Sequence, residues 1–587
     1  MPTFIEALQK KCLQAMQAAF PEWPSHQSFP LEVVQSTHAQ FGHYQCNSAM
    51  KLAKEMGKKP RDLATLIVQN IDPNDKDGSP IIEKLEIAGP GFINITLSPA
   101  FLSKKLDAIL FTPHLNVTLP QHKQRIIVEF SSPNTAKELH VGHLRSTIIG
   151  DCLARLFEFL GHDVIRLNHI GDWGTAFGML IAYMRQQAPQ VLAGTQQVDL
   201  KQLVNWYKQS KEAFDANPEF KKTSQLEVVA LQGGDPASLK AWEIICDISR
   251  KAYQEIYDLM DVRITERGES FYNPMLAETI ADLEAKGLVT VSDGAKCIFL
   301  EGFQTREGSS LPLMVQKSDG GYGYDTTDMA AIRHRTLVEK ADRIIYVTDA
   351  GQSLHFQMVF QAAEKAGYLD RTRTRVDHVP FGLVLGADGK KFRTRSGETE
   401  RLIDLLLTAV KQANQLLLER SPEMPTAERE TLAKALGIGA VKYADLSCNR
   451  TGDYTFSYER MLRFEGNTAA FLMYAYVRVA GIKRKINSSL RIEDIRTPIE
   501  IAHPSEIALA VHLGQFEEAL DQVANDLMPN RLTDYLYGLA EKFNAFFRDC
   551  RVEGSPQQNS RLLICEAVAR TMKQGLAILG VQAVEKM

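Results

Sequence analysis

The spacing of hydrophobic and polar positions changes along the chain. Beyond about residue 125, short apolar runs at 126–128, 164–167, 343–347 and 379–385 are separated by segments with helical spacing. Strands that alternate with helices favour a parallel sheet of crossover units. We therefore expect an α/β, Rossmann-like domain in the middle of the chain.

The flanking regions have a different texture. The first region combines helical periods with a strand pattern at 85–95, which Gly89-Pro90-Gly91 interrupts, and it ends in a polar, proline-bearing stretch typical of a linker. After residue 401 the chain looks helical throughout, with a proline-bearing break at 421–425. The expected division is an N-terminal α+β domain at 1–120, the parallel-sheet domain at 121–420 with a helical insertion at about 186–266, and an all-α bundle at 421–587.

Composition limits the class of protein. The 587 residues are 44% hydrophobic and 24% charged, which is typical of a globular protein with several domains. The net charge of −4 excludes a uniformly basic coat protein, so any surface that binds a polyanion must be regional. The eight cysteines show no C-x-x-C spacing, which favours reduced thiols in a cytoplasmic protein and predicts no zinc site. No run of 18 apolar residues predicts a membrane span.

A dense polar cluster follows the first predicted strand of the sheet. It spans 131–143 and contains His140 and His143, which share one face of a helix, with Gly142 between them. Ligands of open parallel sheets bind outside the carboxyl ends of the strands, where a helix N-terminus attracts anions. The cluster therefore suits a nucleoside triphosphate, and the alternative is two surface histidines near a helix start.

Two further clusters could carry chemistry. A glycine turn at 386–389 is followed by cations, and residues 371–395 hold seven Lys or Arg against two Asp. Such a loop can neutralise a leaving pyrophosphate, although a solvated run of charges is the common alternative. In the segment 318–328, Tyr324 and Asp328 lie four apart, so an aromatic ring and a carboxylate could hold a guanidinium or ammonium group. The alternative there is a helix cap with an acid that faces solvent.

Together the motifs resemble a known family. The sequence His-Val-Gly-His at 140–143 resembles the HIGH signature of class I aminoacyl-tRNA synthetases, and Lys-Phe-Arg-Thr-Arg-Ser at 391–396 occupies the place of their KMSKS signature. The flanking segments at 131–137 and 168–175 resemble those of arginyl-tRNA synthetases, and the resemblance runs from about residue 41 to the last residue.

The resemblance implies a ligase with a two-step reaction. Arginine would attack ATP, supplied with Mg²⁺, to give arginyl-adenylate and pyrophosphate, and the arginyl group would pass to the 3′ end of tRNA(Arg). The resemblance also implies a cytoplasmic monomer with a class I catalytic domain, an N-terminal domain that touches the tRNA elbow and a C-terminal anticodon-binding bundle. No structural metal or membrane partner is expected.

The resemblance also assigns roles to residues. Those that would bind ATP or act in catalysis are His140, Gly142, His143, Lys391, Arg393, Arg395 and Ser396. Arg395 stands where the common signature has its final lysine, and Lys137, just upstream of the first signature, is expected to compensate. Those that would bind arginine are Ser132, Asn134, Glu269, Tyr324, Asp328 and Gln352. Two carboxylates suit the planar, permanently charged guanidinium better than the point charge of a lysine.

The segment 458–485 has six Lys or Arg against two Glu, interleaved with aromatic residues, which suits single-stranded RNA loops. Residues expected to contact tRNA are Tyr44, Gln45, Tyr474, Arg478 and Met587. Two rival hypotheses remain. One is a catalytically silent tRNA-binding paralogue, which should lack one of His140, His143 or Asp328. The other is an adenylate-forming enzyme with a small acceptor, which the long helical C-terminal region disfavours.

Overall fold

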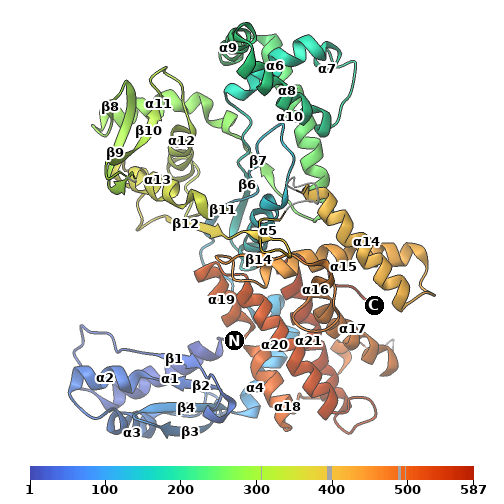
Figure 1. Ribbon diagram of the computed structural model, residues 1–587. Helices are drawn as coiled ribbons and strands as arrows, with labels where there is room; N and C mark the ends of the chain where they lie inside the picture. The colour runs from blue at the N-terminus through green and yellow to red at the C-terminus, as the bar shows by residue number, and fades with distance from the viewer. Residues whose placement is uncertain (306, 393–399, 487–490, 496) are drawn as a thin grey trace. The chain divides into compact units, whose positions relative to one another are not determined.

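A computed structural model of the chain describes residues 1–305, 307–392, 400–486, 491–495 and 497–587 (Figure 1). The chain forms two compact units. Unit 1 comprises 1–119, 463–577 and 582–587, and unit 2 comprises 120–462 and 578–581.

Unit 2 is organised by a five-stranded parallel sheet with the order β12-β11-β5-β6-β7. Its strands are β5 (Arg125–Glu129), β6 (Asp163–Asn168), β7 (Thr265–Glu266), β11 (Arg343–Asp349) and β12 (Arg375–Phe381). The central position of β5 follows from its sequence, because Ile126, Ile127 and Val128 are all fully buried and only a strand covered on both faces reads as a continuous apolar run. The predicted α/β fold class is confirmed.

Helices connect the strands of this sheet. The connecting helices are α5 (Val141–Phe159), α6 (Thr175–Gln187), α11 (Asn273–Ala285), α12 (Tyr324–Leu337) and α13 (Ser353–Lys365). Helix α5 approaches the chain after β5 so closely that a Cβ added at Gly150 would lie 2.2 Å from Phe130. A glycine is therefore required where this helix meets the sheet.

The stretch between β6 and β7 is helical, as the sequence indicates. It contains α7 (Pro189–Leu192), α8 (Leu200–Ala216), α9 (Pro218–Gln232) and α10 (Pro236–Leu259). Helix α6 packs against α8 and α9, and Figure 1 shows these helices gathered into one cluster.

Unit 2 contains a second sheet that the sequence pattern did not predict. Strands β8 (Thr290–Ser292), β9 (Ala295–Gln304) and β10 (Ser310–Gln316) pair antiparallel in the order β10-β9-β8. Polar residues such as Lys296 and Glu301 interrupt their apolar positions, and β10 is irregular in register. Short strands of this kind carry a weak periodic pattern.

The remaining elements of unit 2 are β13 (Val384–Leu385), α14 (Leu402–Arg420), α15 (Thr426–Leu446), β14 (Tyr454–Thr455) and α16 (Tyr458–Met461). The break expected at 421–425 separates α14 from α15. Residues 421–462, which the sequence assigns to the helical bundle, belong to unit 2, since α15 packs on α14 and on α5. Strand β14 pairs in parallel with β13, so the expectation of helix alone after residue 401 is wrong at this point. The division into three domains stays a prediction.

Unit 1 combines an N-terminal α+β part with a helical part. The N-terminal part, drawn in blue in Figure 1, contains α1 (Phe4–Ala19), β1 (Val33–Gln35), β2 (Tyr44–Cys46), α2 (Ser48–Met56), α3 (Pro60–Asn70), β3 (Ile82–Ala88), β4 (Phe92–Leu97) and α4 (Pro99–Phe111). Its sheet is antiparallel with the order β1-β2-β4-β3, and the expected glycine-proline interruption is the turn between β3 and β4. The helical part contains α17 (Ala469–Ile486), α18 (Pro504–Gly514), α19 (Phe516–Asp526), α20 (Asn530–Asp549) and α21 (Gln558–Ile578).

One buried tyrosine joins the two parts of unit 1. Tyr44 of β2 is fully buried, and its hydroxyl lies 2.9 and 3.0 Å from the two carboxylate oxygens of Glu518 on α19. Glu518 also accepts hydrogen bonds from the Ile5 amide and from Gln35. This acid therefore gathers α1, β1 and β2 on one helix of the bundle. In the part of the chain that the structure describes, no helix has the length and apolar character of a membrane span.

We expect Gly150→Ala to destabilise unit 2 although alanine favours helices. The gain in helix propensity is about 1 kcal/mol, whereas overpacking against Phe130 costs about 1–3 kcal/mol. The matched control is Gly481→Ala in α17, where only the Arg484 guanidinium lies within 4 Å of an added Cβ, at 3.9 Å. The control should gain up to about 1 kcal/mol. Thermal and urea unfolding test both, and equal shifts of the same sign would contradict the close packing.

Candidate active site

A cavity of about 740 Å³ opens at the carboxyl end of the parallel sheet, lined by the segments that follow β5, β6, β11 and β12. The loop after β5 enters it in a strained conformation, because Ser131 and Ser132 have φ angles of 66° and 48°. The Ser131 amide donates to Ser146 Oγ and the Ser132 amide to Asn168 Oδ1, each at 2.9 Å. These bonds hold the strained loop in place.

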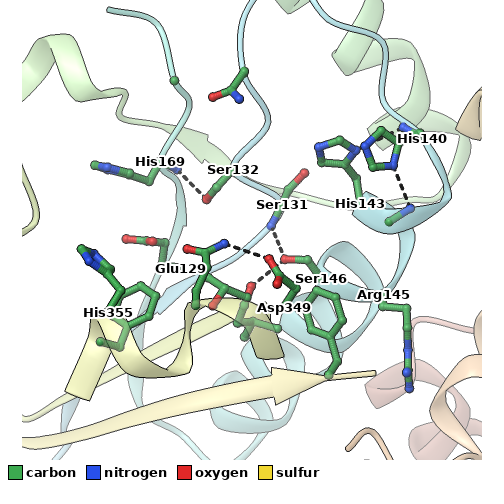
Figure 2. Close-up of a pocket in the computed structure, with 18 of the residues that line it drawn as sticks. Glu129, Ser131, Ser132, His140, His143, Arg145, Ser146, His169, Asp349 and His355 are labelled. Carbon is green, nitrogen blue, oxygen red and sulfur yellow. Dashed lines mark hydrogen bonds between the residues drawn. The ribbon is translucent and has the colours of Figure 1, made fainter. Parts of the chain in front are cut away.

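His140 and His143 lie side by side at one end of the cavity (Figure 2), and both cap α5. The Gly142 amide donates to His140 Nδ1 at 3.0 Å, and the His140 amide donates to His143 Nδ1 at 3.1 Å. A side chain at Gly142 would collide with the His140 ring, since an added Cβ would lie 2.7 Å from Cε1. Gly142 therefore leaves space for the His140 ring as well as for a ligand.

Both histidines are neutral at pH 7. Burial, followed by the charges of Lys391 and Lys137, lowers the pKa of His140, and burial lowers the pKa of His143 to about 3. Because each Nδ1 accepts a hydrogen bond, each ring carries its proton on Nε2. The pair thus offers N–H donors, close to the Lys391 ammonium, to an anionic ligand.

The opposite end of the cavity is acidic. Glu269, Tyr324 and Asp328, which the sequence suggests as a pocket for arginine, line it together with Asp325. Burial, and then the negative charges of Asp328 and Asp172, raise the pKa of Glu269 to about 8. Burial alone would raise the pKa of Asp328 as well, but the hydrogen bond from His355 and the positive charges of His355, His169 and Arg335 together outweigh it, so the pKa lies below its ordinary value. One acid is therefore ionised at pH 7 and its neighbour is mostly protonated.

Three more predicted residues line the cavity: Ser132, Asn134 and Gln352. Asn134 forms a parallel bridge with Gly171, where an added Cβ would lie 2.1 Å from the Asn134 side-chain oxygen. Gln352 donates to Asp349 Oδ2 at 3.0 Å. A backbone bridge thus positions Asn134, and a neighbouring carboxylate positions the Gln352 amide.

Other predicted site residues lie elsewhere. Lys137 does not line the cavity, and its ammonium stands 5.7 Å from the centre of the Tyr207 ring on α8. It is still close enough to lower the pKa of His140, after burial and Lys391. Arg393, Arg395 and Ser396 lie outside the described residues.

The residues predicted to contact RNA lie in unit 1. Tyr474 is 45% exposed, and the Arg478 guanidinium lies 4.9 Å from the ring centres of both Tyr474 and Phe547. Arg478 also donates to Asn544 at 2.7 Å.

The other three differ in their exposure. Gln45 is half-buried and donates to Asn94 at 2.8 Å, and Met587 is half-buried. Tyr44, being fully buried, suits a packing role rather than the predicted contact with RNA.

Sequence reasoning missed several residues of the cavity. They include Glu129, Arg145, His169, Asp325, Asp349 and His355. A signal existed for His355, which follows Gln352 by three residues and so shares its face of a helix. Glu129 and Arg145 had none, because each is buried in an ion pair whose partner, Arg335 or Asp445, is distant in sequence. Among the described residues, no group of three or more His, Cys, Asp or Glu side chains is placed to hold a metal ion.

Comparisons with known proteins agree with this architecture. A family model described as the class I (R) tRNA synthetase catalytic domain matches residues 105–458. A DALR anticodon-binding domain model matches 472–587, and an arginyl-tRNA synthetase N-terminal domain model matches 6–97. The parallel sheet and its cavity are thus the catalytic domain of a class I tRNA synthetase.

Comparison of the full chain with its relatives identifies the family within this class. The chain is 64% identical to an arginine–tRNA ligase of Protochlamydia amoebophila and 52% identical to one of Chlamydia felis, over the full length of both partners in each case. A crystal structure of arginyl-tRNA synthetase from Plasmodium falciparum superposes with a TM-score of 0.86 at 31% identity and covers all of both chains. The chain belongs to the arginyl-tRNA synthetase family.

The raised pKa of Glu269 predicts a pH-dependent affinity for a guanidinium ligand. Below pH 8 the empty site holds Glu269 protonated, whereas a bound cation favours the carboxylate, so binding releases a proton. Affinity should therefore rise by about tenfold or more between pH 6.5 and 8 and level off above pH 8. Calorimetry with arginine as the probe, in buffers of different ionisation enthalpy, measures both effects. The Glu269→Gln variant should bind more weakly and lose this pH dependence.

Proposed function

We propose that the chain is an arginine–tRNA ligase, which activates arginine with ATP and transfers it to the 3′ end of tRNA(Arg). The observation that carries the proposal is the polarity of one cavity. Neutral N–H donors and a lysine stand at one end, and carboxylates beneath an exposed tyrosine stand at the other. Such a site binds an anionic and a cationic group at once.

The first step joins the two ends of the cavity. A carboxylate oxygen of arginine attacks the α-phosphorus of ATP, an acyl–phosphate bond forms, and the bond to pyrophosphate breaks. His140 and His143 would donate to phosphate oxygens, and Lys391, with Arg393, Arg395 and Ser396, would steady the departing pyrophosphate. Charge neutralisation and positioning suffice for such a transfer, so no protein nucleophile is needed. Mg²⁺ would arrive with ATP as part of the substrate.

The arginine would lie with its side chain toward the acidic end. Glu269 and Asp328 would accept from the guanidinium, whose five donors match two carboxylates, and the Tyr324 ring would cover it. Ser132, Asn134 and Gln352 would hold the α-amino and carboxylate groups. Gly142 would leave space beneath the adenine.

Lys137 is proposed to supply the positive charge that the second signature lacks at position 395. Its support is electrostatic, since Lys137 is among the charges that lower the pKa of His140. A modest side-chain movement away from Tyr207 would bring the ammonium toward the phosphates.

In the second step, the 3′ end of tRNA(Arg) would enter the cavity, and other parts of the tRNA would bind to unit 1. The ribose hydroxyl of the terminal nucleotide attacks the arginyl carbonyl, and AMP leaves. Tyr474 and Arg478, half-exposed and stacked, would meet unpaired bases. Gln45 and Met587, both half-buried, are further proposed contacts. The three proposed functional domains span 1–120, 121–420 and 421–587.

Two further proposals concern the oligomeric state of the protein and its cellular compartment. We propose that the chain acts as a monomer. The eight cysteines are free thiols, which suits the reducing cytoplasm.

The rival of a catalytically silent paralogue predicts a defect in the cavity. His140, His143 and Asp328 are all in place there. The rival with a small acceptor does not account for the match to an anticodon-binding domain model.

The decisive experiment is ATP–pyrophosphate exchange with each amino acid, with and without tRNA(Arg). Arginine should support exchange, and Asp328→Ala should raise the KM for arginine by about tenfold or more while changing that for ATP little, because it removes one charge-assisted pair worth about 1.5–3 kcal/mol. Exchange with lysine or glutamate in preference to arginine would overturn the proposed specificity. No exchange with any amino acid would favour the silent paralogue.

The proposed RNA contact predicts a separable defect. Tyr474→Ala should raise the KM for tRNA(Arg) by about tenfold, since loss of one base–aromatic stack costs about 1–3 kcal/mol. The KM for arginine should not change. The control is Val291→Ala, which shortens an exposed side chain on unit 2, away from the proposed RNA contacts on unit 1. Unchanged charging kinetics in Tyr474→Ala would remove this residue from the RNA surface.

A further inference from the structure

His355 is a histidine that the proposed reaction leaves without a role, and it lies directly against the acidic end of the cavity. It stands in the first turn of α13, and Figure 2 shows it near His169, at the end of the cavity away from His140 and His143. Its Nε2 lies 2.5 Å from Asp328 Oδ2, and its Nδ1 lies 3.2 Å from Asp325 Oδ1. Both ring nitrogens therefore face carboxylates of α12.

An imidazole between two carboxylates is a cation. Burial by itself lowers the pKa of His355, but the hydrogen bonds to Asp325 and Asp328 outweigh burial and raise the pKa to about 10. With both nitrogens protonated, the ring donates to each acid at once.

The other neighbours of His355 do not compete for this proton. The Phe356 ring lies edge-on to it with ring centres 5.3 Å apart, and His378 of β12 stacks on the same Phe356 ring. Burial, and then Arg450, lower the pKa of His378 to about 4, so His378 is neutral at pH 7. The charged groups that face His355 are thus the two acids of α12.

Asp325 is itself fixed in orientation. Its Oδ2 accepts from the Met314 amide of β10 at 2.8 Å, which leaves Oδ1 for His355. A chain of contacts therefore runs from the small antiparallel sheet through Asp325 and His355 to Asp328. The other carboxylate oxygen, Asp328 Oδ1, lies 4.0 Å from His169 Nε2, and Asp328 lines the cavity.

We propose that His355, oriented by Asp325, is a positioning and specificity-determining residue that locks Asp328 so that a single carboxylate oxygen receives the guanidinium of arginine. The inference rests on the proposed function of the cavity and adds to it a residue that does not touch the substrate. A carboxylate free to rotate accepts a cation from any direction. A locked oxygen accepts along one fixed direction, which the rigid guanidinium fork is shaped to meet. The freely rotating donors of an ammonium group can follow a carboxylate in any orientation and so gain less from the lock.

The kinetic test uses variants that separate charge, hydrogen bonding and packing. His355→Leu removes both hydrogen bonds, whereas His355→Gln retains a donor that can reach Asp328. The matched control is His162→Gln, which changes a half-buried histidine near the amino end of the sheet, outside the cavity. Each variant is assayed by ATP–pyrophosphate exchange with arginine and with lysine, in the presence of tRNA(Arg).

We expect His355→Leu to raise the KM for arginine by about tenfold or more with little change in the KM for ATP. Exchange with lysine should not fall in parallel, so the preference for arginine over lysine should shrink. His355→Gln should recover most of the loss, and the control should match the parent protein. A parent-like KM for arginine in His355→Leu, or an equal loss for arginine and ATP, would overturn the proposal.

A spectroscopic test does not depend on activity. In protein labelled with ¹⁵N-histidine, the His355 signals, assigned by their loss in His355→Gln, should show both nitrogens protonated at pH 8 in the full chain. Asp325→Asn should move the titration of His355 to lower pH. A neutral His355 at pH 8, or a titration that Asp325→Asn leaves unchanged, would overturn the locking. If the parent protein shows this signature but no exchange with arginine, the proposed function fails while the lock stands.

Discussion

The parallel pairing of β5 between β6 and β11 is the constraint on which the site depends. Because the strands run in the same direction, the segments that leave them all emerge at one edge, where the positive end of the α5 dipole also points. The strained turn at Ser131 and Ser132 and the glycine contact between α5 and Phe130 are consequences of this crowding. Residues that are about two hundred positions apart in the sequence therefore meet around one cavity.

Electrostatics then divides that cavity into two halves. At the His140 end, burial keeps imidazoles neutral and leaves them as donors, so lysine charges remain available for an anion. At the Glu269 end, burial opposes the ionisation of Glu269, whereas Asp328 stays charged because the His355 imidazolium compensates it. The same physical cost of burying charge thus has opposite consequences at the two ends, and both prepare the site for a zwitterionic substrate with a cationic side chain.

Buried polar contacts also organise unit 1. Glu518 collects hydrogen bonds from Tyr44, Gln35 and the Ile5 amide, so a single acid ties the small antiparallel sheet to the helical part. The stacked Tyr474 and Arg478 stay half-exposed on the same unit. Burial therefore separates the aromatic residues that hold this unit together from those that are available to a partner.

The sequence by itself determined the parallel sheet, the helix that follows His140 and the placement of Tyr324 and Asp328 on one helix at the cavity, because each follows from local periodicity or from a compact motif. It missed β8–β10, whose alternation is broken by polar residues, and it assigned Tyr44 to a surface although the side chain is buried. Only the tertiary structure decided that His355 faces Asp328, that Glu129 pairs with Arg335, and that Glu269 holds its proton near neutral pH. Those properties depend on burial and on charges brought from distant segments, and no local pattern records either.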